Sequence, residues 1–103
     1  MKSKRTKAVD INSKVKKTVW ERDGRRCILC GRANAMPNAH YRPRSKGGLG
    51  IEQNVVTLCL QCHHDMDQTK ERPILLGMVK CYLISKYKDW NEEDLIYKKG
   101  KEN

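Results

Sequence analysis

Cysteine and histidine are the residues of this chain whose spacing could support metal chemistry. Four of the five cysteines form two Cys-x-x-Cys pairs, Cys27/Cys30 and Cys59/Cys62. Tetrahedral zinc takes four such ligands, and each pair can supply two of them, whereas a redox Cys-x-x-Cys motif would need only one pair. The spacing therefore predicts a structural zinc site formed by these four thiolates, with residues 31–58 looping out between its two halves.

The composition indicates a small domain that needs such a site. The chain has 103 residues, of which 38% are hydrophobic and none is Phe. A core of that size is marginal, and a structural zinc ion contributes about 10–16 kcal/mol in small zinc modules. The net charge is +10, and residues 1–26 hold ten basic and three acidic side chains. This excess favours a nucleic-acid partner, with a merely solubilising lysine surface as the alternative.

The helices and strands that position these residues can be predicted from the spacing of hydrophobic residues and from the places of Gly and Pro. Ser13 is the expected N-cap of the first helix, and Pro73 suits the first turn of a later one. Gly47, Gly48 and Gly50 demand an irregular loop. In chain order we expect a basic disordered arm over residues 1–9, a helix over 14–22, extended segments at 37–41 and 55–58, and helices over 62–70, 74–88 and 91–100. We expect residues 10–103 to form one domain, with a core over 20–70 and a helical C-terminal extension over 73–100.

The stretch from about residue 20 to residue 70 resembles the HNH endonucleases, a family with a ββα-metal active site. The residues that carry the resemblance are Ala39-His40-Tyr41-Arg42-Pro43, Gly47-Gly48, Asn54-Val55-Val56-Thr57-Leu58-Cys59 and Cys62-His63. The motif is similar to that of standalone HNH proteins of phages and bacteria. The resemblance implies a small α+β fold, in which a ββα-metal core is stapled by the four-cysteine zinc site and flanked by N-terminal and C-terminal helices.

The resemblance also implies roles for three residues. His40 would be the general base, Asn54 would brace the loop, and His63 would bind the catalytic divalent metal. The chemistry agrees, because phosphodiester hydrolysis needs an activated water, a Lewis acid and stabilisation of the leaving oxygen. A neutral imidazole suits the base because its pKa lies near working pH. We expect the surrounding positive charge to lower the pKa of His40 further.

One position departs from the family pattern. Many members carry Asp or His directly before the first histidine, as a metal ligand, and here that residue is Ala39. Asp67 offers a replacement, because residues four apart on a helix share one face. With waters and a phosphate oxygen, His63 and Asp67 could hold Mg²⁺ or Mn²⁺, and Ni²⁺ or Zn²⁺ are further candidates. A carboxylate that merely lies on a helix surface is the alternative for Asp67.

Three basic residues, Arg42, Arg44 and Lys46, flank the proposed base where phosphate contacts would lie. Solvated loop charges are the alternative for all three. His64 would point about 100° away from His63 on a helix, so we expect it to be solvated or to contact DNA. Cys81, the fifth cysteine, is expected to be a small buried residue of a helix.

The sequence therefore predicts an HNH endonuclease that hydrolyses DNA phosphodiester bonds and binds DNA mainly through its phosphates. A non-catalytic, zinc-stabilised DNA-binding module derived from such a nuclease is the first alternative, which Ala39 would suit. A zinc adaptor that binds protein is the second. The charged N-terminus is no secretory signal, and the longest apolar stretch, residues 74–84, is too short to span a bilayer. We expect an intracellular, cytoplasmic protein without membrane contact.

Overall fold

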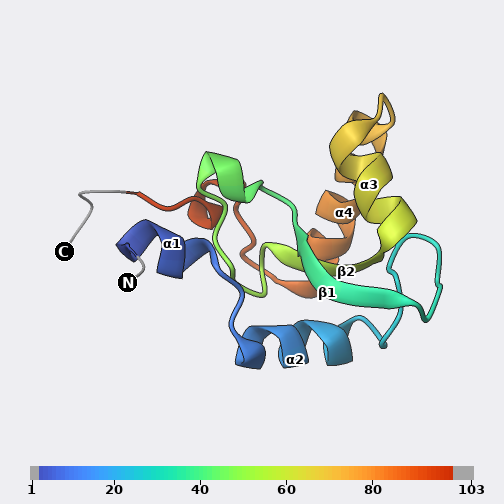
Figure 1. Cartoon of the computed structure of the whole chain (residues 1–103), viewed down its shortest axis with the longest axis horizontal. Coiled ribbons are helices and arrows are strands. Elements are labelled where there is room, and N and C mark those ends of the chain that lie inside the picture. The colour runs from blue at the N-terminus through green and yellow to red at the C-terminus, as the bar shows by residue number, and fades with distance from the viewer. Residues whose placement is uncertain (1–2, 99–103) are drawn as a thin grey trace.

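The computed structural model describes residues 3–98, which form a two-stranded sheet with helices on both sides (Figure 1). The fold is α+β, as expected. Its elements in chain order are α1 (Lys4–Val9), α2 (Ser13–Arg22), β1 (Ala35–His40), the 3-10 helix η1 (Arg44–Lys46), β2 (Val55–Cys59), α3 (Leu60–Gln68), α4 (Arg72–Lys86) and the 3-10 helix η2 (Glu92–Leu95). No helix within residues 3–98 has the length and apolar character to cross a membrane.

The sheet places the predicted zinc ligand Cys59 and the predicted base His40 at its two ends. Strands β1 and β2 pair antiparallel, with His40 opposite Val55 at one end and Ala35 opposite Cys59 at the other. The register is irregular between Met36 and Ala39, around Pro37, which has no N–H to give to the ladder. Every residue of β2 is buried. Cys59 and His40 therefore lie at opposite ends of the two-stranded sheet.

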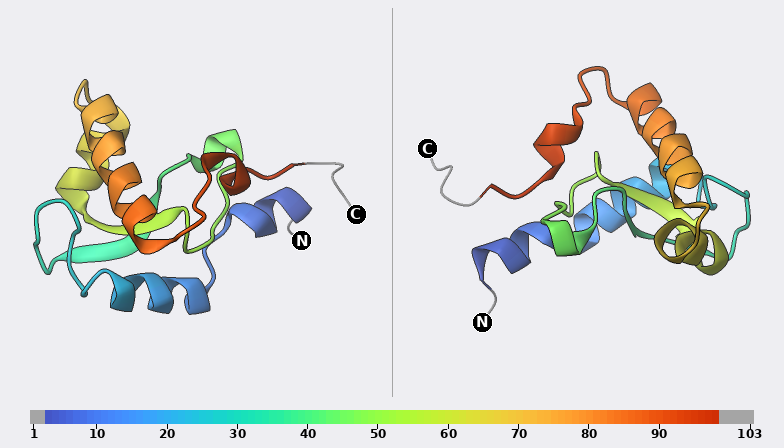
Figure 2. Two further views of the ribbon diagram at one scale, coloured as in Figure 1. Left: turned by 180° about the vertical axis from the view of Figure 1, so that it is seen from behind. Right: turned by 90° about the horizontal axis from the view of Figure 1, so that it is seen from above.

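Helices cover both faces of this sheet. Helix α2 packs on one face, α3 crosses the other, and α4 packs against α3 (Figures 1 and 2). The buried cluster between the layers contains two of the metal-site cysteines, Cys27 and Cys59, together with aliphatic side chains from β2, α3, α4 and η2. Two of the four predicted cysteine ligands are thus part of the core, Cys62 is partly buried and Cys30 is exposed.

The N-terminal segment differs from the expected disordered arm. Residues Lys4–Val9 form helix α1, and the side chain of Ser3 accepts a hydrogen bond from the Thr6 N–H as its N-cap. Val9 is only 3% exposed, and the Ala8 carbonyl accepts a 2.9 Å hydrogen bond from the Gly50 N–H. A six-residue helix is not stable by itself, so these tertiary contacts are what order it.

Helix ends show which local signals the sequence carries. The N-cap of α2 is Asn12, whose side chain accepts from the Val15 N–H, and not Ser13 as expected. Gly24 follows α2 at φ +72°, just after residue 22, where the expected helix ends. The prediction of a C-terminal helix over 91–100 is wrong for residues 91–98. Asn91 caps only the 3-10 helix η2, and Ile96 is extended and pairs with Gly48. Gly100 lies outside the described residues.

Two further expectations concern α4. It begins at Arg72 with Pro73 in its first turn, and Val79 and Leu83 are buried, as the apolar spacing predicts. Cys81 is exposed on this helix and not buried as expected.

A buried ion pair that the sequence analysis did not single out joins α2 to β2 and α4. The Asp23 carboxylate accepts two hydrogen bonds from Arg22, at 2.7 and 3.1 Å, and a third from the Thr57 N–H at 2.8 Å. The Tyr82 hydroxyl also donates to it. Arg22 in turn donates to the Val55 carbonyl at 2.8 Å and to the Tyr87 hydroxyl at 3.0 Å. The side chain of Asp23 is fully buried and that of Arg22 is 11% exposed.

Replacing Asp23 by asparagine is expected to destabilise the domain by about 3–5 kcal/mol, because Arg22 would be left as a buried charge without its counter-ion. Urea unfolding of the metal-loaded chain measures this change. The control is Glu21→Gln, which removes an exposed ion pair with Arg25 and should cost at most about 1 kcal/mol. Equal losses in the two variants would show that the buried network contributes no more than a surface pair.

Candidate metal centre and cleft

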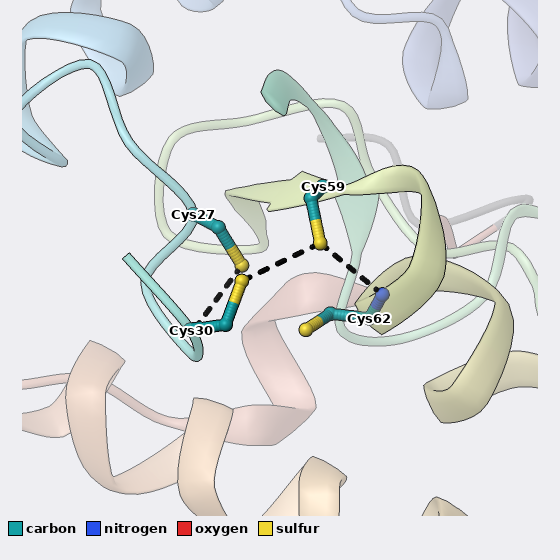
Figure 3. A group of neighbouring side chains, drawn as sticks. All are labelled: Cys27, Cys30, Cys59 and Cys62. Atoms are coloured by element: carbon teal, nitrogen blue, oxygen red, sulfur yellow. Dashed lines mark hydrogen bonds between the residues drawn. The ribbon is translucent and has the colours of Figure 1, made fainter. Parts of the chain in front are cut away.

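The four predicted cysteine ligands come together at one end of the sheet. Cys27 and Cys30 lie in the loop between α2 and β1, Cys59 ends β2, and Cys62 lies in the first turn of α3. Figure 3 shows the four side chains converging from these two segments. Their sulfur atoms all lie within 4.8 Å of one another, and Sγ of Cys30 is 3.5 Å from Sγ of Cys59.

These separations fit one tetrahedral metal ion. With Zn–S bonds of about 2.3 Å, the sulfurs of a tetrahedral zinc site lie about 3.8 Å apart, so small shifts of the side chains would complete the geometry. Within residues 3–98, the four cysteines are the only group of three or more His, Cys, Asp or Glu side chains that could share an ion. The group can therefore hold a metal, which confirms the coarser part of the prediction.

Each cysteine pair is held by a tight turn whose amides point at sulfur. The Cys30 N–H lies 3.4 Å from Sγ of Cys27, and the Cys62 N–H lies 3.4 Å from Sγ of Cys59. Gly31, at φ +78°, closes the first turn. In the second pair Cys59 is itself the N-cap of α3. Helix α3 starts at Leu60 and not near Cys62 as expected. The turn that holds Cys59 and Cys62 is therefore the first turn of α3.

The thiols of this group differ in their tendency to lose a proton. Burial would raise the pKa of Cys27, but hydrogen bonds from the backbone of Cys59, Cys30 and Leu29 outweigh it and lower the pKa to about 7. For Cys62, burial and hydrogen bonds with the other three thiols act together and raise the pKa. A cation is therefore needed before all four can be thiolates, and metal binding would release protons.

The second site is a cleft of about 450 Å³ lined by His40, His63 and Asp67. Three basic residues, Arg44, Lys46 and Arg72, line the same cleft. The structure thus brings together the residues that the sequence analysis assigned to base and catalytic metal. They come from the end of β1, from α3, from η1 and from the start of α4.

The ring of His40 is held in a defined orientation. Its Nε2 lies 2.9 Å from the Val9 carbonyl oxygen, and the residue is 8% exposed. A carbonyl oxygen only accepts hydrogen bonds, so Nε2 carries the proton and Nδ1 keeps a free lone pair. Burial is the largest cause and lowers the pKa of His40, and the positive charge of Arg44 lowers it further, although the Val9 hydrogen bond and Asp10 act in the opposite direction. A neutral imidazole is therefore favoured at pH 7.

His63 and Asp67 lie one turn apart on α3, as expected for positions 63 and 67. Nε2 of His63 is 3.3 Å from Oδ2 of Asp67, and Nη1 of Arg72 is 3.9 Å from the other carboxylate oxygen. The 3.3 Å separation matches two neighbouring ligands of an octahedral ion, which lie about 3.0 Å apart at Mg–O distances of 2.0–2.1 Å. It also matches an ion pair between Asp67 and a protonated imidazole.

Asn54 braces the loop between the two strands. Its side-chain oxygen accepts from the Arg42 N–H at 2.8 Å, and its amide donates to the carbonyls of Leu49 at 2.8 Å and Arg42 at 3.2 Å. The side chain is completely buried. These bonds tie the two ends of the loop that carries η1.

The basic residues predicted to contact phosphate do not all face the cleft. Arg44 and Lys46 line it, and Arg44 also pairs with Asp10 at 2.7 Å. Arg42 turns to Glu92 at 2.8 Å and lines a different hollow. His64 lines another hollow, beside Cys59. Sequence reasoning missed Arg72, since no spacing rule connects the start of α4 to a loop some thirty residues earlier.

Comparison with known proteins shows the following similarity. The chain is 37% identical over 51 residues to "Anaredoxin" of Nostoc sp., an alignment that covers 48% of this chain and 67% of that protein. The chain belongs to the same family as anaredoxin. No protein-family model matches the chain, and no solved structure matches it.

Proposed function

We propose that this chain is an HNH endonuclease that hydrolyses DNA phosphodiester bonds with a histidine general base and a divalent metal. The observation that supports this proposal most is the gathering of His40, His63 and Asp67 in one basic cleft, in a chain that also has a four-cysteine group able to hold a metal. The succession β1, loop, β2 and α3 has the order of elements that a ββα-metal core would need. In this proposal the four cysteines hold a structural zinc ion.

His40 would act as the base through Nδ1. The hydrogen bond from Nε2 to the Val9 carbonyl fixes the ring, so the Nδ1 lone pair is the one available to accept a proton from water. As the water O–H bond breaks and the Nδ1–H bond forms, the ring becomes a cation. The Val9 carbonyl oxygen stabilises that cation, because the N–H that donates to it becomes positively charged.

His63 and Asp67 would hold the catalytic metal, for which Mg²⁺ or Mn²⁺ is the first choice. Such an ion, when bound, polarises the phosphate and stabilises the leaving oxygen. The buried methyl of Ala39 offers no ligand to this site. Arg72, next to Asp67, adds a positive charge at the place where phosphate oxygens would approach.

DNA is the partner that the charge distribution favours. Arg44, Lys46 and Arg72 surround the cleft, and the exposed lysines of α1 and α2 extend the positive surface away from it. Contacts of this kind bind phosphates without reading base sequence. Affinity for duplex DNA should therefore fall steeply with salt, whereas a zinc adaptor for protein would show almost no such dependence.

Cleavage of supercoiled plasmid with added Mg²⁺ or Mn²⁺ tests the proposal. His40→Ala should reduce the rate by about 10²–10⁴-fold, the usual contribution of a positioned general base. The wild-type rate should fall as the pH drops and Nδ1 becomes protonated. Because the pKa of His40 is lowered from 6.5, this fall should lie below pH 6.5, with a plateau from neutral pH upward.

The His40→Ala variant should lack this acid limb. Equal rates for wild type and His40→Ala would reject the nuclease. Salt-dependent DNA binding without cleavage would then identify the non-catalytic DNA-binding module.

Electron transfer at the four-cysteine group is a second candidate, supported by the name of the relative anaredoxin. A tetrahedral set of four thiolates accepts iron as well as zinc, and zinc has no redox chemistry. Metal analysis of the purified chain separates the two functions. Iron in stoichiometric amount, with a reversible one-electron reduction, would favour electron transfer, and zinc would exclude it.

A further inference from the structure

We propose that helix α1 is a positioning element of the cleft: its last carbonyl, from Val9, holds the His40 ring, and its docking on the η1 loop keeps that carbonyl in place. This inference rests on the proposed nuclease function and deepens it. It assigns a role to a segment that local sequence signals alone do not order.

The first contact is the hydrogen bond itself. Nε2 of His40 lies 2.9 Å from the Val9 oxygen, across 31 residues of chain, and it is the ring's one hydrogen bond within the described residues. Without this acceptor nothing would fix which ring nitrogen carries the proton or which one faces the cleft. Helix α1 therefore selects the nitrogen that acts as base.

Gly50 makes the docking tight. Its N–H donates to the Ala8 carbonyl at 2.9 Å, and the residue is buried. A Cβ at this position would lie 2.1 Å from the Asp10 oxygen and 2.9 Å from the Val9 oxygen. Both are backbone atoms that cannot move without shifting the end of α1. Only glycine allows the Val9 carbonyl to stay where His40 meets it.

Two side chains secure the helix to the loop that lines the cleft. Nη2 of Arg5 lies 3.2 Å from the Arg44 carbonyl oxygen and 3.3 Å from that of Ser45. Nη2 of Arg44 lies 2.7 Å from Oδ1 of Asp10. Figure 1 shows α1 beside η1. Helix α1 also carries the exposed Lys4 and Lys7. The helix that would contact phosphate is therefore the same helix whose last carbonyl orients the base.

Gly50→Ala tests this role, with Gly77→Ala as the matched control. A Cβ at Gly77, exposed on α4, would meet nothing within 4 Å. In the metal-loaded full chain labelled with ¹⁵N-histidine, His40 should show a slowly exchanging Hε2 proton in wild type and Gly77→Ala, and none in Gly50→Ala. The single-turnover rate at saturating DNA should fall in Gly50→Ala by on the order of 10- to 100-fold, and stay unchanged in Gly77→Ala.

Arg5→Ala provides a second test if Gly50→Ala does not fold. It removes the two loop contacts, and Lys4→Ala removes the same charge from the same helix. Both variants should weaken DNA binding. Only Arg5→Ala should speed the exchange of Hε2 and lower the single-turnover rate at saturating DNA. A protected Hε2 in Gly50→Ala and Arg5→Ala, or its loss without a slower rate, would overturn the inference. If wild type cleaves no DNA, the nuclease proposal fails, and Hε2 exchange still reports whether α1 holds His40.

Discussion

Replacing Cys27 by serine is expected to leave the chain largely unfolded at 25 °C. Cys27 is 2% exposed and belongs to the buried core cluster, so the metal centre is continuous with that core. A structural zinc ion contributes about 10–16 kcal/mol, which equals or exceeds the whole stability of an ordinary domain, about 5–15 kcal/mol. Far-UV circular dichroism and metal content, measured on the same preparation, check this expectation.

Cys81→Ser is the matched control. Cys81 is exposed on α4 and does not belong to the four-sulfur group, so the variant should keep both its helical signal and its metal. A strong chelator should unfold wild type as completely as the Cys27 substitution does. A Cys27→Ser chain that stays folded after its metal is removed would show that the core alone supports the fold.

Local signals carry much of this fold, which is why the sequence predicts it. The two Cys-x-x-Cys pairs define both ends of the metal site, and Gly24 stops α2. The apolar spacing over residues 74–88 places Val79 and Leu83 in the core. In each case the physical cause lies within a few residues of its effect.

Features that depend on distant partners could not be predicted. Helix α1 is ordered by Gly50 and by the His40 ring, more than thirty residues away. The Arg22 side chain reaches Tyr87 across 65 residues. At the C-terminus, pairing of Ile96 with Gly48 replaces the helix that the sequence expects there. The spacing of residues within a single segment cannot predict these contacts.

The same limit applies to the cleft. The spacing of His63 and Asp67 predicts their common face, because both lie on one helix. The distribution of basic residues depends instead on the path of the loop after β1. That path sends Arg42 to Glu92 and Arg44 into the cleft. Three positively charged residues near a proposed base are therefore not equivalent, although their sequence context suggests that they are.

Helix α3 contributes residues both to the four-cysteine group and to the cleft. Substitutions on α3 should therefore be able to affect one of these sites without the other. Cys59 and Cys62 bind its first turn to the metal centre, and His63 and Asp67 face the cleft. His63→Ala is expected to abolish metal-dependent cleavage, with a loss of at least about 10²-fold. A divalent ion contributes several kcal/mol of charge stabilisation, and each 1.4 kcal/mol is tenfold in rate.

The neighbouring histidine is the control for this substitution. His64 lines a hollow beside Cys59 and not the cleft, so His64→Ala removes the same side chain from the same helix turn without touching the proposed ligands. Both variants should keep the helical signal and the metal of the four-cysteine group. Cleavage should be lost only in His63→Ala, and high Mn²⁺ should restore part of it, since Asp67 remains. Equal activity of the two variants would mean that the ion acts elsewhere, and loss of fold in His63→Ala would assign that residue to the metal-stabilised core instead.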